Sequence, residues 1–146
     1  MSSLSEELNK NGYVISPTVG DSMYPLLNTR RDHVMIRRVS GERLKKNDLP
    51  LYQRPSGQYV LHRIIRVRDN CYYTRGDNRT GLEKVPQEWV LGVVTSFCRK
   101  GKEFSADSRG YRFYSWIWGI TYPVRWLGIK TKRFFRKLAG KMRSVD

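Results

Sequence analysis

Between Tyr13 and Cys98 the sequence is a succession of short runs rich in β-branched and aromatic residues, each closed by turn-forming residues. Five of these runs predict strands, at residues 33–39, 49–54, 58–67, 71–75 and 89–97. Clusters of Gly, Pro, Ser, Asn and Asp separate the runs, as at Ser40-Gly41. The block contains neither an internal repeat nor a helical periodicity. We therefore predict a mainly β domain built from antiparallel strands.

The positive charge of the chain is concentrated after this block. The 146 residues include 28 Lys and Arg against 13 Asp and Glu, a net charge of +15. From Arg99 onward there are 13 basic and 3 acidic residues, a net charge of +10, so most of the excess lies in the last third. The composition predicts an N-terminal segment (1–16), a β domain (17–98), a linker (99–110) and a basic aromatic tail (111–146).

The N-terminal segment lacks the charged start and apolar stretch of a secretory signal peptide, so we expect a cytoplasmic chain. A Ser3 or Ser5 cap predicts a short helical turn that Gly12 ends. Cys71 and Cys98 form no C-x-x-C pair and belong to no Cys/His cluster, so we expect neither a metal nor another cofactor.

The stretch "TVGDSMYPLL" holds a serine, Ser22, in a turn bracketed by Gly20 and Pro25. A serine hydroxyl is a poor nucleophile at neutral pH, and it needs a nearby base and backbone N–H groups directed at the developing oxyanion. A turn of this kind can hold a nucleophile in place. Taken alone, however, the commoner role of such a serine is a hydrogen bond within the turn.

Two further residues favour chemistry at Ser22. His62 lies inside the apolar run "YVLHRII", where an imidazole is costly to bury without partners. Asp77 lies in the Gly-Asp-Asn turn after another predicted strand. A satisfied core histidine and an Asx-turn aspartate are the structural alternatives. The other histidine, His33, has no comparable companion motif and is expected to be structural or exposed.

Six motifs, in this order and at these spacings, support the interpretation that Ser22 is a nucleophile: "GDSMYPLL", "RDHVMI", "LKKNDLPLYQ", "YVLHRIIRV", "YYTRGDN" and "WVLGVV". From about Val19 to Thr95 the chain resembles the catalytic core of the signal peptidase I superfamily, which includes the LexA-type repressors. The resemblance implies an antiparallel signal-peptidase/LexA-like β fold with Ser22 as nucleophile. The general base of this family is a lysine in one branch and a histidine in another. Since His62 occupies the position of the base, the chain resembles the Ser-His branch.

The resemblance also implies a carboxylate that orients the base. Asp77 matches the Gly-Asp-Asn motif of the family and is our first choice, with Glu83 as the second. Gly20 stands where some members carry a hydroxyl donor, so we assign the oxyanion donor to the Ser22 backbone N–H. We expect His62 to titrate near neutrality, with a pKa that its carboxylate raises.

The tail predicts contact with a membrane surface. Its uncharged run, residues 113–124, is 12 residues long, short of the roughly 20 that span a bilayer. The amphipathic stretch that follows has the composition of an interfacial helix. The residues expected to contact lipid are Trp116, Trp118, Trp126, Phe134 and Phe135. A helix packed on the domain's own sheet is the alternative, and nucleic acid is a less favoured partner because no helix-turn-helix precedes the block.

Together these features predict a serine endopeptidase that cleaves a peptide or protein precursor, attached peripherally to an anionic membrane. Ordinary signal peptidases carry an N-terminal transmembrane helix, which this sequence lacks. A non-catalytic relative that binds peptides or membranes with the same fold is the alternative function.

Overall fold

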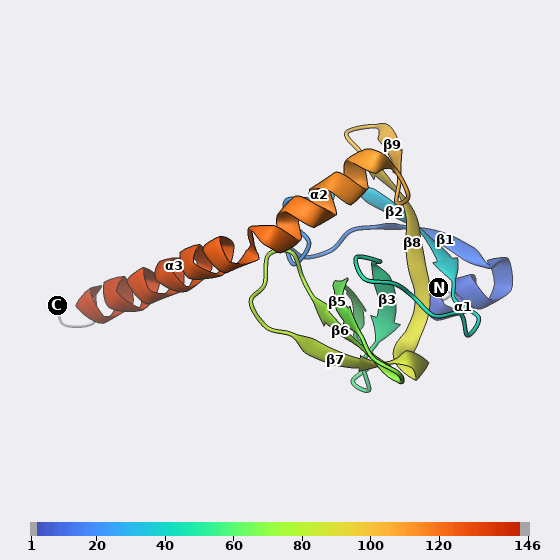
Figure 1. Cartoon of the computed structure of the whole chain (residues 1–146), viewed down its shortest axis with the longest axis horizontal. Coiled ribbons are helices and arrows are strands. Elements are labelled where there is room, and N and C mark those ends of the chain that lie inside the picture. Colours follow the sequence, from blue (N-terminus) through green and yellow to red (C-terminus); the bar gives the residue numbers. More distant parts are fainter. Residues whose placement is uncertain (1–2, 144–146) are drawn as a thin grey trace. The chain divides into compact units, whose positions relative to one another are not determined.

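The computed structural model describes residues 3–143, and in this range the chain forms nine strands, three α-helices and one 3-10 helix (Figure 1). The chain divides into two compact units, Met1–Arg112 and Phe113–Asp146. All the strands lie in the first unit. The predicted mainly β class is therefore confirmed.

The strands of the first unit form two antiparallel sheets that curl into a half-barrel. The larger sheet has the order β1-β2-β8-β3-β4, with β9 paired to β8, and the smaller has the order β5-β6-β7. The larger sheet comprises β1 (Tyr13–Pro17), β2 (His33–Arg38), β3 (Pro50–Gln53), β4 (Tyr59–Leu61), β8 (Val90–Arg99) and β9 (Lys102–Ser105). The smaller comprises β5 (Arg63–Val67), β6 (Cys71–Arg75) and β7 (Glu83–Pro86), and the 3-10 helix η1 (Gln87–Trp89) leads from it into β8.

Two clusters of buried side chains join the sheets into one core. In one, Val93 of β8 packs with Ile64 of β5 and Tyr72 of β6. In the other, Tyr52 of β3 packs with Val85 of β7. Burial of such side chains contributes roughly 1.5–3 kcal/mol each, so the core fixes β3 against the small sheet. This packing matters for function because β3 and β7 each carry a residue of the candidate site.

The run predicted as one strand, residues 58–67, is two strands in different sheets. β4 ends at Leu61 and β5 begins at Arg63, so His62 lies at the break between them and not in mid-strand. The chain pairs with β3 before this point and with β6 after it. A change of partner sheet is a tertiary event, and the local pattern of β-branched residues does not record it.

The predicted linker, residues 99–110, also differs from the expectation. β8 continues to Arg99, and β9 returns along it as a hairpin with Phe104 opposite Phe97. Gly101 adopts a φ of +77°, a left-handed conformation suited to the tight turn between the strands. The strands β1 and β7 were not predicted either.

The predicted N-terminal turn is a helix, α1 (Leu4–Asn11). The Ser3 hydroxyl accepts a hydrogen bond from the Glu6 N–H while the Glu6 carboxylate accepts one from the Ser3 N–H, which completes a capping box. Gly12 ends the helix in the left-handed conformation. The capping signal in the sequence therefore predicted both ends of this helix.

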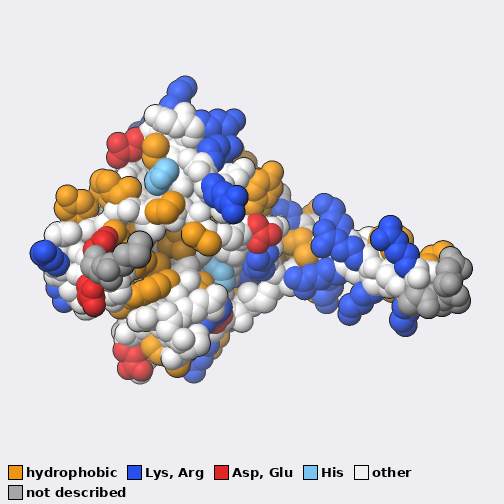
Figure 2. Space-filling model, turned by 180° about the vertical axis from the view of Figure 1, so that it is seen from behind, with side chains coloured by type: hydrophobic (Ala, Val, Ile, Leu, Met, Phe, Trp, Pro, Cys, Tyr) orange, Lys and Arg blue, Asp and Glu red, His pale blue; other side chains and the backbone are white. Residues whose placement is uncertain are grey.

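The second unit is helical. α2 (Arg109–Ile120) begins in the first unit and continues into the second, and α3 (Tyr122–Arg143) follows after a break at Thr121. Among residues 3–143, no helix is both long and apolar enough to cross a membrane. The basic side chains follow α3 along most of its visible length, with hydrophobic side chains between them (Figure 2).

Candidate active site

Ser22 lies in the loop between β1 and β2, and apolar residues of this loop anchor it by packing into the core. Met23, Leu26 and Leu27 are buried, whereas Ser22 is only partly buried. Gly20 has a φ of +80°, which glycine adopts without the steric penalty of a side chain. The buried side chains that follow Ser22 in "GDSMYPLL" thus hold its turn against the core.

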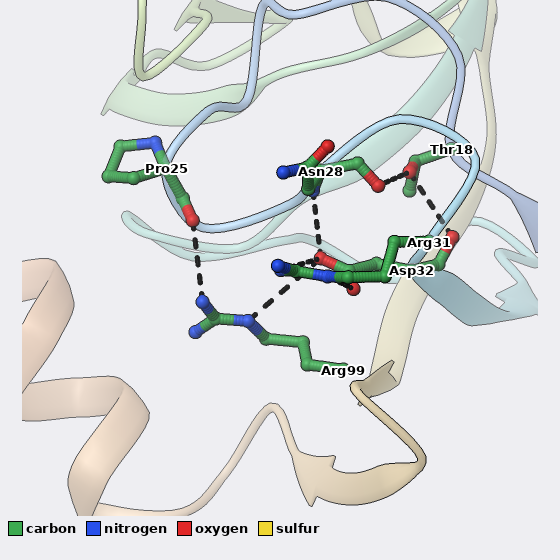
Figure 3. A network of polar contacts seen from close by, with 6 residues as sticks. All are labelled: Thr18, Pro25, Asn28, Arg31, Asp32 and Arg99. Carbon is green, nitrogen blue, oxygen red and sulfur yellow. Dashed lines mark hydrogen bonds and ion pairs between the residues drawn. The ribbon is translucent and has the colours of Figure 1, made fainter.

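A buried carboxylate fixes the base of this loop (Figure 3). Asp32 is fully buried and accepts two hydrogen bonds from the Arg31 guanidinium, at 2.7 and 3.0 Å, and one from the Asn28 N–H at 2.8 Å. Arg99 of β8 lies 4.0 Å from Asp32 and donates a hydrogen bond to the Pro25 carbonyl. Burial alone would raise the pKa of Asp32, but these hydrogen bonds hold it below its ordinary value. The network ties the Ser22 loop to the large sheet.

The loop after β6 packs directly on Ser22. The Asn78 N–H donates a 2.8 Å hydrogen bond to the Ser22 carbonyl oxygen. A Cβ atom on Gly76 would lie 2.6 Å from that oxygen and 3.1 Å from the Ser22 Cβ. Arg79 forms an ion pair with Asp21, which lowers the pKa of Asp21 through a hydrogen bond. Glycine at position 76 is therefore required by the close approach of two backbones.

His62 lies at the same end of the small sheet. In the β5–β6 register Arg63 is opposite Arg75, so the preceding His62 and the following Gly76 are neighbours at the end of this strand pair. Gly76 also contacts Ser22, and Ser22 and His62 therefore flank one loop. Within residues 3–143 the two side chains form no mutual hydrogen bond, and catalytic contacts of this kind are often long before substrate binds.

The imidazole of His62 is held by a tyrosine. Its Nδ1 atom lies 3.2 Å from the Tyr52 hydroxyl, which donates a 2.7 Å hydrogen bond to Glu83 Oε2. Arg54 in turn donates to both oxygens of Glu83, at 2.8 and 2.7 Å. The second-choice carboxylate, Glu83, thus reaches the histidine through Tyr52.

Burial lowers the pKa of His62 to about 4, and the negative charge of Glu83 only partly offsets this. The expectation of a pKa raised above its ordinary value is therefore wrong for this structure. The imidazole is neutral at pH 7, the state that a general base requires.

The first-choice carboxylate, Asp77, is hydrogen-bonded to Arg63, and its negative charge acts on His62 less strongly than that of Glu83. Its two oxygens accept hydrogen bonds from Arg63 at 2.7 and 2.8 Å, and both side chains are buried. Arg63 also donates to the Tyr111 hydroxyl, which donates to the Asn47 carbonyl. This arrangement anchors the Gly-Asp-Asn loop to the strand that follows His62.

The remaining predicted residues lie as follows. Among residues 3–143, the Ser22 N–H donates no hydrogen bond. An oxyanion donor needs to have no other acceptor before the reaction begins. His33 is exposed at the start of β2. Within the same range no three His, Cys, Asp or Glu side chains converge as a metal site.

Of the residues expected to contact lipid, Trp116, Phe134 and Phe135 are 60–61% exposed. The other two are partly covered by cations: the Arg125 guanidinium lies 3.6 Å from the centre of the Trp118 ring, and the Lys130 ammonium lies 4.0 Å from that of Trp126.

Comparisons with protein-family models, with curated proteins and with solved structures found no match for this chain. The functional assignment consequently depends on the residues themselves.

Sequence reasoning missed Tyr52 and Arg54 as members of this cluster. Both belong to the run "LPLYQR", where Tyr52 has the pattern of an ordinary core aromatic. A tyrosine at an inward-facing strand position does carry one signal, since its buried hydroxyl needs a polar partner.

Proposed function

We propose that this protein is a serine endopeptidase of the signal-peptidase type, with Ser22 as nucleophile and His62 as general base. The Ser22 Oγ attacks the carbonyl carbon of the scissile peptide bond while its proton passes to Nε2 of His62. The tetrahedral oxyanion accepts a hydrogen bond from the Ser22 N–H. The intermediate then releases the amine, which takes the proton from His62, and leaves an ester on Ser22. Water, deprotonated by the same imidazole, hydrolyses this ester and restores the hydroxyl.

The observation that carries the proposal is the shared position of Ser22 and His62 beside the loop at Gly76. The Ser22 carbonyl accepts a hydrogen bond from the Asn78 N–H and lies so close to Gly76 that a Cβ atom there would clash with it. His62 adjoins the same loop at the start of β5. The two residues are 40 positions apart in sequence, yet the Ser22 loop, the loop after β6 and the start of β5 meet at one end of the small sheet. The signal-peptidase/LexA-like variant of the half-barrel forms part of this proposal.

The second unit supports a location at an anionic membrane surface. Residues 113–143 carry eight basic and no acidic side chains: Arg125, Lys130, Lys132, Arg133, Arg136, Lys137, Lys141 and Arg143. Leu127, Phe134, Leu138 and Met142 fall on one flank of α3 by their spacing, and all four are exposed. Each basic residue near an anionic leaflet contributes about 1 kcal/mol, and the apolar flank inserts below it.

The test of catalysis is cleavage of a diverse synthetic peptide library, followed by mass spectrometry, with the full chain and with Ser22→Ala. The proposal expects specific cleavage by the wild type and none by Ser22→Ala or His62→Ala. Because the two residues act as one unit, the double variant should lose little more than either single one. Equal cleavage by wild type and Ser22→Ala would overturn the mechanism, and no cleavage by either would favour the non-catalytic peptide- or membrane-binding relative.

A further inference from the structure

The hydrogen bonds around the Tyr52 hydroxyl determine which nitrogen of His62 carries the proton. Glu83 is paired with Arg54 in a bidentate contact, whose hydrogen bonds lower the pKa of the carboxyl, so Glu83 is ionised and can only accept. The single Tyr52 proton must therefore point at Glu83. The phenolic oxygen then has only lone pairs for its other two neighbours.

Those two neighbours are Thr74 and His62. The Thr74 hydroxyl lies 3.2 Å from the Tyr52 oxygen and, because the Tyr52 proton points at Glu83, must be the donor. Nδ1 of His62 lies at the same distance and must also donate, which places the imidazole proton on Nδ1. Nε2 is then unprotonated, and this is the atom that can take the Ser22 proton.

We infer that Tyr52, oriented by Glu83 and Arg54, is the positioning residue that fixes the reactive tautomer of His62. The inference rests on the proposed function and adds to it a tyrosine between the histidine and its carboxylate. In the usual triad the carboxylate contacts the imidazole directly. Here the charge of Glu83 is one hydroxyl away, so its stabilisation of the imidazolium is weaker.

The Tyr52 hydroxyl is suited to this role because it keeps its proton. Burial raises the pKa of Tyr52 well above its ordinary value, as does the adjacent carboxylate. The ring itself is completely buried, and the same side chain that fills the core between β3 and β7 presents its hydroxyl to the site. The chain thus uses one residue for packing and for positioning.

The tautomer can be measured without any substrate. The full chain is labelled with ¹⁵N-histidine, and the ring nitrogens of His62 are observed by NMR at pH 7, assigned by their loss in His62→Gln. The chain contains two histidines, so His33 serves as an internal reference. We expect Nδ1 to be protonated and Nε2 to be bare in the wild type. Protonation at Nε2 in the wild type would overturn the inference.

Tyr52→Phe should move the proton toward Nε2 and reduce kcat/KM roughly tenfold, the value of one hydrogen bond. The matched control is Tyr72→Phe, which removes another buried hydroxyl, one that contacts Leu44 and Gln87. The control should leave the tautomer unchanged. An unchanged tautomer in Tyr52→Phe, or an equal change in both variants, would contradict the inference.

Glu83→Leu provides a second variant that leaves the Tyr52 ring in the core. The leucine side chain accepts no hydrogen bond, so the Tyr52 proton is free to turn toward Nδ1. The Nε2-protonated form should therefore increase, as in Tyr52→Phe, and an unchanged tautomer would count against the inference. Because the NMR readout needs no cleavage, failure of the positioning role is distinguishable from failure of the peptidase proposal, which Ser22→Ala tests.

Discussion

Asp77 and Arg63 form a bidentate ion pair whose side chains are 2% and 3% exposed, with both distances below 3 Å. Arg63 directly follows His62, and Asp77 directly follows the glycine that contacts Ser22. The pair therefore joins the segment of the proposed base to the loop that supports the proposed nucleophile.

Asp77→Asn should act on stability. The substitution leaves the Arg63 charge buried without its counter-ion, a change that costs roughly 3–5 kcal/mol of unfolding free energy. Urea denaturation measures this loss. The control is Asp69→Asn at a fully exposed carboxylate, which should change stability by less than about 0.5 kcal/mol. Unchanged stability with a changed pH profile of cleavage would instead return the orienting role to Asp77.

Gly76→Ala should displace Ser22. The added methyl group would lie 2.6 Å from the Ser22 carbonyl oxygen, and a backbone atom cannot move aside as a flexible side chain does. We expect cleavage to fall by at least tenfold, since a misplacement of about 1 Å can cost about a hundredfold. Gly81→Ala is the matched control, because its Cβ would meet nothing within 4 Å. Equal activity in the two variants would show that Ser22 is not held by this contact.

The pKa of His62 predicts a pH dependence of stability. The folded value is about 4 and the unfolded value about 6.5, so between these pH values the unfolded chain binds more protons. Stability should therefore rise with pH in this window. His62→Gln should flatten the slope by up to about 1 kcal/mol per pH unit. Urea unfolding at several pH values between 4 and 7 measures both slopes, and identical slopes in the wild type and His62→Gln would contradict the burial of a neutral imidazole.

Phe134→Ser should weaken membrane binding of the full chain. Insertion of a phenylalanine into lipid contributes roughly 1.5–3 kcal/mol, so loss of this ring should reduce affinity at least about tenfold. Co-sedimentation with vesicles of equal parts phosphatidylserine and phosphatidylcholine measures it. Phe104→Ser, at an exposed position of β9, is the control and should bind as the wild type does.

A salt titration completes that experiment. Binding that persists in part at high salt indicates apolar insertion, whereas binding that disappears entirely indicates charge alone. Wild-type affinity in Phe134→Ser would favour the helix packed on the protein's own surface.

The sequence predicted those parts of the fold that local chemistry determines. The capping box of α1 and the turn residues between strands act over a few positions, so Ser3, Gly12 and the boundaries of β2, β3 and β6 could be recognised to within one residue. The break at His62 could not, because it results from a change of partner sheet. The hairpin at Gly101 was also missed, since its strand β9 is short, exposed along its length and polar apart from Phe104.

The candidate site shows the same division. His62 stands out because an imidazole is unusual inside an apolar run, whereas Ser22 stands out only through the motif "GDSMYPLL" that surrounds it. The partner of His62 does not, because Tyr52 resembles any core aromatic until its hydroxyl is seen beside Glu83. The choice between Asp77 and Glu83 likewise depended on Arg63 and Arg54, two arginines whose spacing in sequence gives no indication of their acceptors.

The most direct test of the proposed chemistry is covalent labelling of Ser22. The full chain is incubated at pH 7 with a serine-reactive fluorophosphonate, and the adduct is located by peptide mass spectrometry. We predict one adduct, on Ser22, that is absent in Ser22→Ala and forms at least about a hundredfold more slowly in His62→Ala, because the base activates the hydroxyl. An unmodified Ser22 in the folded wild type, or labelling that is equally fast in His62→Ala, would contradict the assignment of these two residues as nucleophile and base.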